Sequence, residues 1–166
     1  MPQAVFHILA ALIIADIIRD HWFHKKHFPL YLVLIAGIGG ILPDIDVLVY
    51  WAVSLFAKAD YTLFHRTFTH SLLFLALFLV PAIILWKHEK YHKIFLMLAL
   101  GITVHLALDA TFQGAIMPLF PFSAATVGLN LWGNAFAGTM AQGIDTILLV
   151  LWLIYIEWRH KVSDFI

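Results

Sequence analysis

The chain has 166 residues, of which 63% are hydrophobic and 12% are charged. Soluble domains average about 45–50% apolar and about 25% charged residues, so this composition excludes an ordinary water-soluble protein. The formal net charge is zero, which excludes a basic nucleic-acid-binding surface, and the absence of cysteine excludes disulfides and thiolate metal sites. The ten histidines are therefore the residues to explain, because an ionisable group within a membrane needs a partner or a function.

Five apolar segments predict an all-α, polytopic membrane protein with about five transmembrane helices in a single domain, residues 1–166. The segments are residues 2–18, 30–42, 71–86, 94–108 and 144–158. Most are shorter than the roughly 20 residues of a full span, so either the helices extend into their polar flanks or the bilayer is locally thin. A sixth apolar stretch, residues 47–57, is too short to cross alone. After Pro43 it continues the second helix at an angle, lies at the membrane interface, or forms an extra half-span.

The distribution of basic residues predicts the orientation, because cytoplasmic loops hold Lys and Arg in excess. With five helices and the N-terminus outside, the cytoplasmic side receives eight of the ten: Arg19, Lys25, Lys26, Lys87, Lys90, Lys93, Arg159 and Lys161. Lys58 and Arg66 then lie on the outer side. We therefore expect a multi-pass protein of the cell membrane with a cytoplasmic C-terminus.

Ionisable residues of four helices are predicted to share one level in the membrane. At 1.5 Å per helical residue they lie roughly 17 to 24 Å above the cytoplasmic ends of their segments. These residues are His7, Asp44, His70, His105 and Asp109. Unpaired carboxylates are costly at that depth, so the five side chains are expected to converge on a shared cation or a water-filled cavity in the outer half of the bilayer.

Two short motifs contain the carboxylates. HLALD (residues 105–109) places a histidine and an aspartate at i and i+4 on one helix face, where both can ligate one ion. In LPDID (residues 42–46), Pro43 is expected to break the helix, so that Asp44 and Asp46 emerge from a bend. Both can bind one ion if the backbone is irregular there; otherwise one is a ligand and the other an outer partner or a bridge to a second ion. For Asp46, helix capping is the alternative.

A third motif, HRTFTHS (residues 65–71), precedes the third segment. A five-residue separation rotates about 140° on a helix, so His65 and His70 share a site if His65 precedes the helix, with Thr67 or Thr69 as its cap. Arg66 lies between the two histidines. Its guanidinium suits an anionic substrate such as a phosphate, or it anchors a lipid headgroup.

The other histidines are predicted to have no metal. His21, His24 and His27 lie among lysines and aromatic residues in an interfacial belt, and His88 and His92 lie in a solvated turn. Asp16 is expected to pair with Arg19 at i+3. The chain contains no P-loop, no GxSxG elbow and no dinucleotide-binding fingerprint.

The long segment 110–143 is apolar, rich in Gly, Pro, Asn and aromatic residues, and without clear periodicity. We expect re-entrant or interfacial turns that cover the ligand cluster and shape a lipid-facing entrance; a simple outer loop is the alternative. The side chains that could line this entrance are Gln113, Asn130, Asn134, Gln142 and Asp145.

Taken together, His7, LPDID, HRTFTHSLLF, HLALD and the G-x-x-x-P-L-x-P-F-S stretch of residues 114–123 resemble the YdjM-like family of inner-membrane-associated, metal-dependent hydrolases, over residues 7–125. Val47 departs from the pattern, because a histidine follows LPDID in many relatives. The ligand set is also similar in kind, though not in spacing, to that of zinc-dependent phospholipase C. The resemblance implies a membrane-bound hydrolase with a metal site formed by His7, Asp44, Asp46, His65, His70, His105 and Asp109.

The expected function is hydrolysis of a phosphoester in a membrane lipid or a lipid-linked substrate. The metal is expected to be zinc, with manganese or iron as alternatives, and would activate water and stabilise charge on the phosphoryl oxygens. Whichever of Asp46 and His65 is not a ligand would act as general base, and Arg66 would bind the substrate. The alternative is a metal or proton transporter with an intramembrane His/Asp site. The enzyme is favoured because the polar residues crowd the outer half of the helices.

Overall fold

The computed structural model describes residues 4–21, 28–58, 60–61, 65–131 and 139–160. Within these ranges the chain is helical, apart from loops and one isolated antiparallel bridge between Ile116 and Val127. The long helices are α1 (Ala4–His21), α2 (Leu30–Ile41), α3 (Ile45–Ser54), α5 (Leu72–Ile84), α6 (Glu89–Leu108) and α7 (Thr139–His160). Helices α2 and α3 are joined by the short 3-10 turn η2 (Leu42–Asp44) and form one rod, so these six helices make five rods. The all-helical fold class is confirmed.

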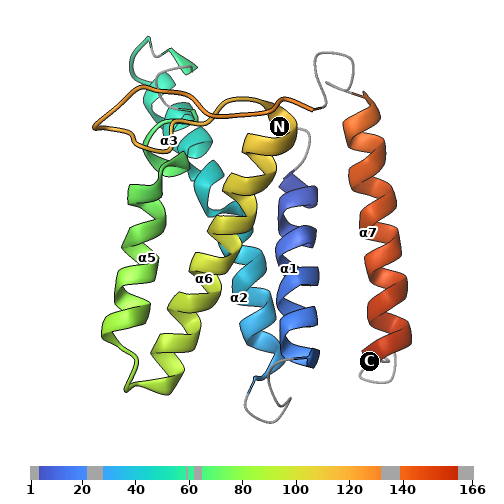
Figure 1. The fold of residues 1–166 in the computed structure, drawn as a ribbon. Helices are drawn as coiled ribbons and strands as arrows, with labels where there is room; N and C mark the ends of the chain where they lie inside the picture. The colour runs from blue at the N-terminus through green and yellow to red at the C-terminus, as the bar shows by residue number, and fades with distance from the viewer. Residues whose placement is uncertain (1–3, 22–27, 59, 62–64, 132–138, 161–166) are drawn as a thin grey trace.

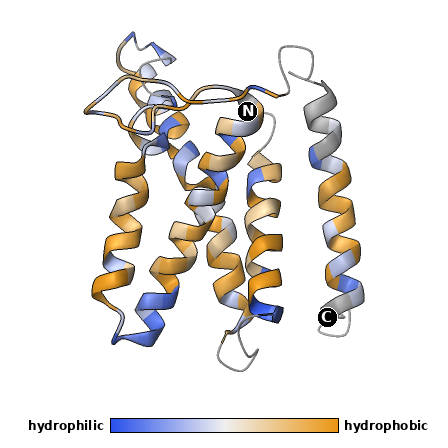
Figure 2. Ribbon diagram, in the orientation of Figure 1, coloured by the Kyte–Doolittle hydropathy of each residue, from blue (hydrophilic) through white to orange (hydrophobic). Residues whose placement is uncertain are grey.

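The rods lie side by side (Figure 1). Helix α2 packs against α1 and α6, α5 packs against α6, and α7 packs against α1. Apolar residues run along the rods, and hydrophilic residues gather toward their ends (Figure 2). Many outward-facing side chains are large and apolar; Ile83 of α5 is 63% exposed and Ile154 of α7 is 60% exposed. An apolar outer surface of this kind fits a lipid environment better than water.

The stretch after Pro43 continues the second helix. Pro43 lies in η2, where the backbone tightens into a 3-10 turn, and the α-helical pattern resumes as α3 as far as Ser54. Proline lacks the N–H of a regular helical bond and is tolerated where the turn is already irregular. Of the three interpretations of residues 47–57, continuation of the second helix therefore holds.

Among the residues that the structure describes, two continuous helical segments are long and apolar enough to cross a membrane by length and composition, Leu30–Ser54 and Glu89–Phe112. They have 25 and 24 residues, whereas the apolar helix α5 has only 13. Helix α1 has 18 residues but includes the charged residues Asp16, Arg19 and Asp20 near its end.

Glycines allow α2 and α6 to approach closely. A Cβ atom at Gly101 of α6 would collide with the carbonyl oxygen of Ala36 and with the backbone nitrogen of Gly40. A Cβ at Gly39 would likewise meet the backbone of Leu98. Small residues at a helix crossing are typical of membrane bundles, where packing rather than hydrophobicity holds helices together. This close crossing positions the polar end of α6 against α2.

A second polar cluster lies at the opposite end of α1. The predicted pair is present: Arg19 Nη1 lies 3.5 Å from Asp16 Oδ1. Arg19 Nε also donates to the carbonyl oxygen of Phe28 at 2.9 Å, and the Tyr155 hydroxyl donates to Asp16 Oδ2 at 2.8 Å. Because Tyr155 belongs to α7, this cluster links the last helix to the first.

Candidate metal centre

The seven side chains predicted as ligands gather at one end of the bundle. His7 comes from α1, Asp44 from η2, Asp46 from α3, His105 from α6, His70 from the 3-10 turn η3 (Phe68–His70), Asp109 from the π-helical turn η4 (Asp109–Gln113) and His65 from the turn before η3. Potential ligand atoms lie within 4.8 Å of one another in two groups, His7 with His105 and Asp109, and Asp44 with His65 and His70. The shared level inferred from helical rise is therefore a real cluster of side chains.

Four atoms at the centre of the cluster, here called the inner four, face one another. They are His70 Nε2, His105 Nε2, Asp44 Oδ1 and Asp109 Oδ2. His70 Nε2 lies 3.2 Å from His105 Nε2, 3.7 Å from Asp44 Oδ1 and 3.4 Å from Asp109 Oδ2. His105 Nε2 lies 3.7 Å from Asp44 Oδ1 and 3.8 Å from Asp109 Oδ2. The inner four thus come from three stretches of the chain, since His105 and Asp109 lie four residues apart where α6 continues into η4.

These distances fit the donor set of a metal ion. Zinc binds imidazole nitrogen and carboxylate oxygen at about 2.0–2.2 Å, so neighbouring ligand atoms of a tetrahedral site lie about 3.3–3.6 Å apart. Five of the six separations among the inner four, all those that involve a histidine nitrogen, range from 3.2 to 3.8 Å. Three of the four residues are buried, with His70 and His105 at 0% and Asp109 at 3% exposure, and Asp44 is nearly so. Buried carboxylates and imidazoles at this spacing can hold a divalent cation.

The hydrogen bonds of His105 fix its tautomer. Its Nδ1 lies 2.7 Å from the carbonyl oxygen of Gly40. A carbonyl only accepts, so Nδ1 carries the hydrogen and a neutral ring presents the lone pair of Nε2 to the inner four. Histidine ligands commonly donate their other ring nitrogen to a backbone carbonyl in this way. The glycine crossing of α2 and α6 therefore also orients a candidate ligand.

His70 lies between the two carboxylates of LPDID. Asp44 faces its Nε2, whereas Asp46 Oδ2 lies 3.4 Å from its Nδ1. Asp46 also accepts hydrogen bonds from the Thr69 hydroxyl at 2.9 Å and from the backbone N–H of Arg66 at 3.3 Å, and lies 3.3 Å from His65 Nδ1. The geometry thus places Asp44 among the inner four and Asp46 behind two histidine rings. Asp44 stands at the N-cap position of α3 but its side chain makes no capping hydrogen bond, and Asp46 lies in the first turn of α3 rather than at its cap, so the capping alternative for Asp46 does not hold.

The protonation of His70 follows from these neighbours. Burial alone would lower the pKa of its imidazole, but hydrogen bonds with Asp109 and Asp46 outweigh burial and raise that pKa to about 9. His70 therefore carries a second proton at neutral pH when no cation is present. That proton must leave before Nε2 can act as a ligand.

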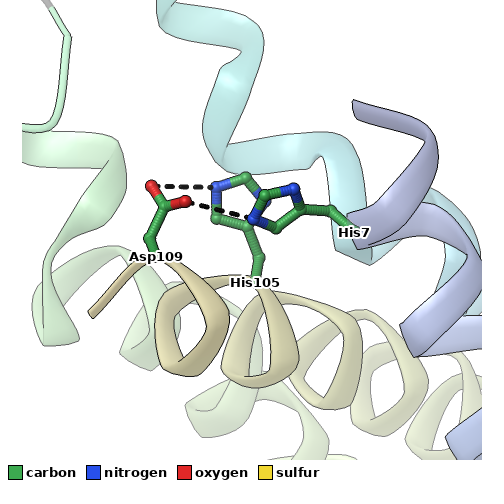
Figure 3. A group of neighbouring side chains, drawn as sticks. All are labelled: His7, His105 and Asp109. Carbon is green, nitrogen blue, oxygen red and sulfur yellow. Dashed lines mark hydrogen bonds and ion pairs between the residues drawn. The ribbon is translucent and has the colours of Figure 1, made fainter. Parts of the chain in front are cut away.

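His7 lies beside the inner four. Its Nε2 is 3.1 Å from Asp109 Oδ1, and its ring centroid is 4.1 Å from that of His105 (Figure 3). Asp109 consequently faces His7 with one oxygen and the inner four with the other. A carboxylate in this position can bridge two cations or hold one cation and orient His7.

Arg66 and Tyr61 lie at the edge of the cluster. Arg66 Nε is 3.5 Å from Asp109 Oδ2, and its side chain is 26% exposed. Its backbone has a φ of 63°, a left-handed conformation that is uncommon outside glycine and often found at functional sites. Tyr61 stacks on His65 with ring centroids 4.9 Å apart. Burial, followed by the charges of Asp46 and Asp44, raises the pKa of the Tyr61 phenol, which therefore stays a hydrogen-bond donor at neutral pH.

One prediction about the HRTFTHS motif was wrong. Neither Thr67 nor Thr69 caps the following helix, because residues 68–70 form a 3-10 turn and α5 begins only at Leu72. Ser71 is the cap, and its side chain accepts from the N–H of Phe74 at 3.2 Å. The Thr69 hydroxyl is thereby left to bond Asp46. His65 precedes the helix, as a site shared with His70 requires.

Residues 114–131 run across the polar end of the bundle above α3 and α6 (Figure 1). The N–H of Leu72 donates to the carbonyl oxygen of Pro118 at 2.9 Å, and that of Leu129 donates to Ala110 at 2.7 Å. The described part of the segment predicted to cover the cluster therefore lies at the same end of the bundle as the cluster, and the covering role stays a prediction. Of the five side chains proposed for an entrance, Asn130 is exposed and Asp145 is buried in α7, while Asn134 and the side chains of Gln113 and Gln142 lie outside what the structure describes.

Residues outside the predicted set also shape the site. Thr69 was expected only as a cap, and neither Tyr61 nor the carbonyl of Gly40 was expected to contribute. Nothing in the sequence distinguishes one backbone carbonyl from another, so the Gly40 contact depends on how the helices cross.

Comparison with known families then identifies the chain. Residues 1–162 match the family described as YdjM inner membrane protein. The chain belongs to this family. The resemblance found on the short motifs is thus confirmed over nearly the whole chain, and the YdjM assignment makes it an inner membrane protein. The search of curated proteins and the search of solved structures both found no match.

Proposed function

We propose that this YdjM family member is a metal-dependent hydrolase that cleaves a phosphoester of a membrane lipid or a lipid-linked substrate. The observation that carries the proposal is that the two histidine nitrogens of the inner four lie 3.2 Å from each other and 3.4 to 3.8 Å from the two carboxylate oxygens. Imidazole and carboxylate donors suit zinc, with manganese or iron as alternatives. When bound, the metal would lower the pKa of a water molecule and stabilise charge on the phosphoryl oxygens.

His65 is the proposed general base, and Asp46 its positioning residue. Asp46 faces the Thr69 hydroxyl, the Arg66 amide and the Nδ1 atoms of two histidines, so its oxygens are already engaged. A carboxylate that accepts from Nδ1–H orients the ring and holds it in the tautomer whose Nε2 lone pair can take a proton. The side chain of His65 is 15% exposed, compared with 0% for His70, so it is the more accessible ring.

Arg66 is the proposed substrate-binding residue. Its guanidinium reaches Asp109 with Nε while about a quarter of the side chain stays exposed beside the cluster. Arginine binds phosphate oxygens through charge-assisted and frequently paired hydrogen bonds. The left-handed backbone at Arg66 supports this assignment, because such strain persists where the surrounding structure holds a side chain in a functional position.

The apolar core of the bundle argues against the transporter alternative. Between His7 and Asp16 on α1 lie Leu9, Leu12 and Ala15, which are buried. They pack in one core with residues of α2 and α6, including Leu32, Ala36 and Met97. Nine helical residues span about 13 Å, so an ion leaving the cluster along α1 would have to cross a packed apolar layer of that thickness.

The membrane arrangement is part of the proposal. We infer that all five rods cross the bilayer, with the N-terminus outside, the C-terminus cytoplasmic and the cluster in the outer half. The support is the uneven distribution of Lys and Arg, together with the apolar outer faces of α5 and α7.

The test compares lipid hydrolysis with metal flux in the same reconstituted vesicles. We expect release of phosphorylated headgroup or phosphate from a panel of lipids, abolished by a chelator and restored by zinc or manganese. Arg66→Ala should lower kcat/KM about 10- to 100-fold, mainly through KM, because a charge-assisted contact is lost while metal content stays unchanged. Lys58→Ala is the matched control, an exposed cation near the same end of the bundle, and should leave kinetics unchanged. Metal flux without hydrolysis of any lipid would support the transporter instead.

A further inference from the structure

An apolar groove of about 380 Å³ lies along the second rod. Its wall is a stripe of side chains spaced three or four residues apart across α2, η2 and α3, namely Ile38, Ile41, Ile45 and Leu48, and it ends at Trp51. Ala4, at the start of α1, closes one side. Ligand sites commonly have volumes of about 300–1,000 Å³, so this groove has room for part of a small amphiphile.

The groove opens to the surroundings of the bundle rather than to its core. Ile38 is 55% exposed, Leu48 is 59% exposed and Trp51 is 60% exposed. All three belong to the Leu30–Ser54 segment, which is long and apolar enough to cross a membrane. A hydrocarbon chain can therefore enter the groove sideways from the bilayer without passing through water.

Asp44 connects the groove to the candidate metal centre. It lines the groove, and its Oδ1 lies 3.7 Å from both His70 Nε2 and His105 Nε2. A second apolar cavity of about 360 Å³, lined in part by Leu75, Leu79 and Leu100, includes none of the cluster residues. The groove thus differs from a merely lipid-facing surface in one respect: Asp44, one of the inner four, lines it.

We propose that this groove binds one hydrocarbon chain of the substrate lipid, with the phosphate of the headgroup at the cluster beside Asp44. The inference rests on the proposed function, because it assigns the headgroup to the same site. The carboxylates of Asp44 and Asp109 repel an anionic phosphate; Arg66 and the protonated His70 offset part of that charge, and a bound metal ion would offset more. Binding of the chain and of the headgroup should therefore be coupled through the metal.

Photo-cross-linking tests the groove without any need for turnover. Full-length protein in phosphatidylcholine vesicles, with zinc or with chelator, is labelled by trace phosphatidic acid that carries a diazirine in its acyl chain. Mass spectrometry should find the label enriched in residues 38–51 over residues 75–100. Leu48→Trp, which fills the groove, should reduce this labelling about fivefold, whereas Leu79→Trp in the second cavity should not. Diacylglycerol with the same chain, which lacks the phosphate, should label the groove more weakly.

Each result has a distinct meaning. Equal labelling of both segments in the wild-type protein would overturn the proposal that the groove binds the chain. A Leu48→Trp variant that labels like the wild type would overturn it as well. If that variant does not fold, the distribution of label in the wild-type protein decides the question. Groove labelling by phosphatidic acid that survives the chelator would keep the chain site and reject its coupling to a metal. Groove labelling with no hydrolysis of any lipid would keep the chain site and reject the proposed enzyme.

Discussion

At the scale of single residues, two histidines of α6 differ in what their second ring nitrogen faces. His92 and His105 both belong to α6, and each uses Nδ1–H to donate to a backbone carbonyl, of Ala82 at 2.8 Å and of Gly40 at 2.7 Å. The Nε2 of His105 faces His70 and two carboxylates, whereas His92 lies at the far end of the helix. The pair therefore separates the effect of a lost hydrogen bond from that of a lost ligand.

His105→Ala is expected to abolish divalent metal binding, whereas His92→Ala retains it. Loss of an outer-shell partner typically lowers metal affinity about 10- to 100-fold, so loss of a ligand should exceed that range. Elemental analysis of protein purified without chelator, followed by zinc titration, measures the effect. Asp109→Asn, which keeps the shape of the side chain, should behave like His105→Ala if both residues are ligands. Protein that carries no transition metal before mutation, or equal losses in both histidine variants, would contradict the proposed site.

At the scale of helices, the site depends on close crossings rather than on the helices alone. The contact between α2 and α6 brings the Gly40 carbonyl to His105, and η2 places Asp44 and Asp46 on opposite sides of the His70 ring. The first contact needs the small residues that let α2 and α6 approach, and the second needs the tight turn η2 beside His70. A substitution that pushes the helices apart should therefore damage the site without touching a candidate ligand.

Gly101→Ala is expected to destabilise the protein and weaken metal binding. Its added methyl group would meet the backbone of α2, and overpacking typically costs about 1–3 kcal/mol, more than the roughly 0.5–1 kcal/mol that alanine gains over glycine in a helix. Thermal unfolding in detergent and zinc titration measure the two effects. Gly143→Ala is the matched control, because a Cβ there meets no atom within 4 Å, and it should leave stability unchanged or slightly raised. Equal Tm values for the Gly101 and Gly143 variants would refute the packing argument.

At the scale of the whole molecule, apolar periodicity was enough to predict five rods, because long hydrophobic runs leave few alternatives to helices. It could not decide the path of the chain after Pro43, since a proline can end a helix or lie in a short 3-10 turn, and neighbouring contacts determine which. The cap of α5 was misplaced for a similar reason: Thr67, Thr69 and Ser71 are all suitable capping residues. Only the tertiary position of Thr69, bonded to Asp46, removes it from that role.

The candidate site could be predicted as a set of residues but not as a set of roles. Helical rise places His7, His70 and His105 at one level, and the structure brings them together. The side of the His70 ring that each aspartate faces depends on the geometry of η2, which a spacing of two residues does not determine. The apolar groove along the second rod was not predicted, because it needs the packing of Ala4 against that rod.

The proposed orientation gives the last prediction. The structure places Lys90 at the start of α6 and the candidate metal centre near its other end, while Lys58 comes after α3 on the side of the cluster. The positive-inside rule then assigns Lys90 to the cytoplasm and Lys58 to the outer surface. Because the chain has no cysteine, single Lys58→Cys and Lys90→Cys variants report one position each. In intact cells an impermeant maleimide should label the Lys58→Cys variant and leave Lys90→Cys unlabelled until the membrane is permeabilised. The opposite pattern would place the cluster in the inner half of the bilayer, and its lipid substrate would then have to come from the cytoplasmic leaflet.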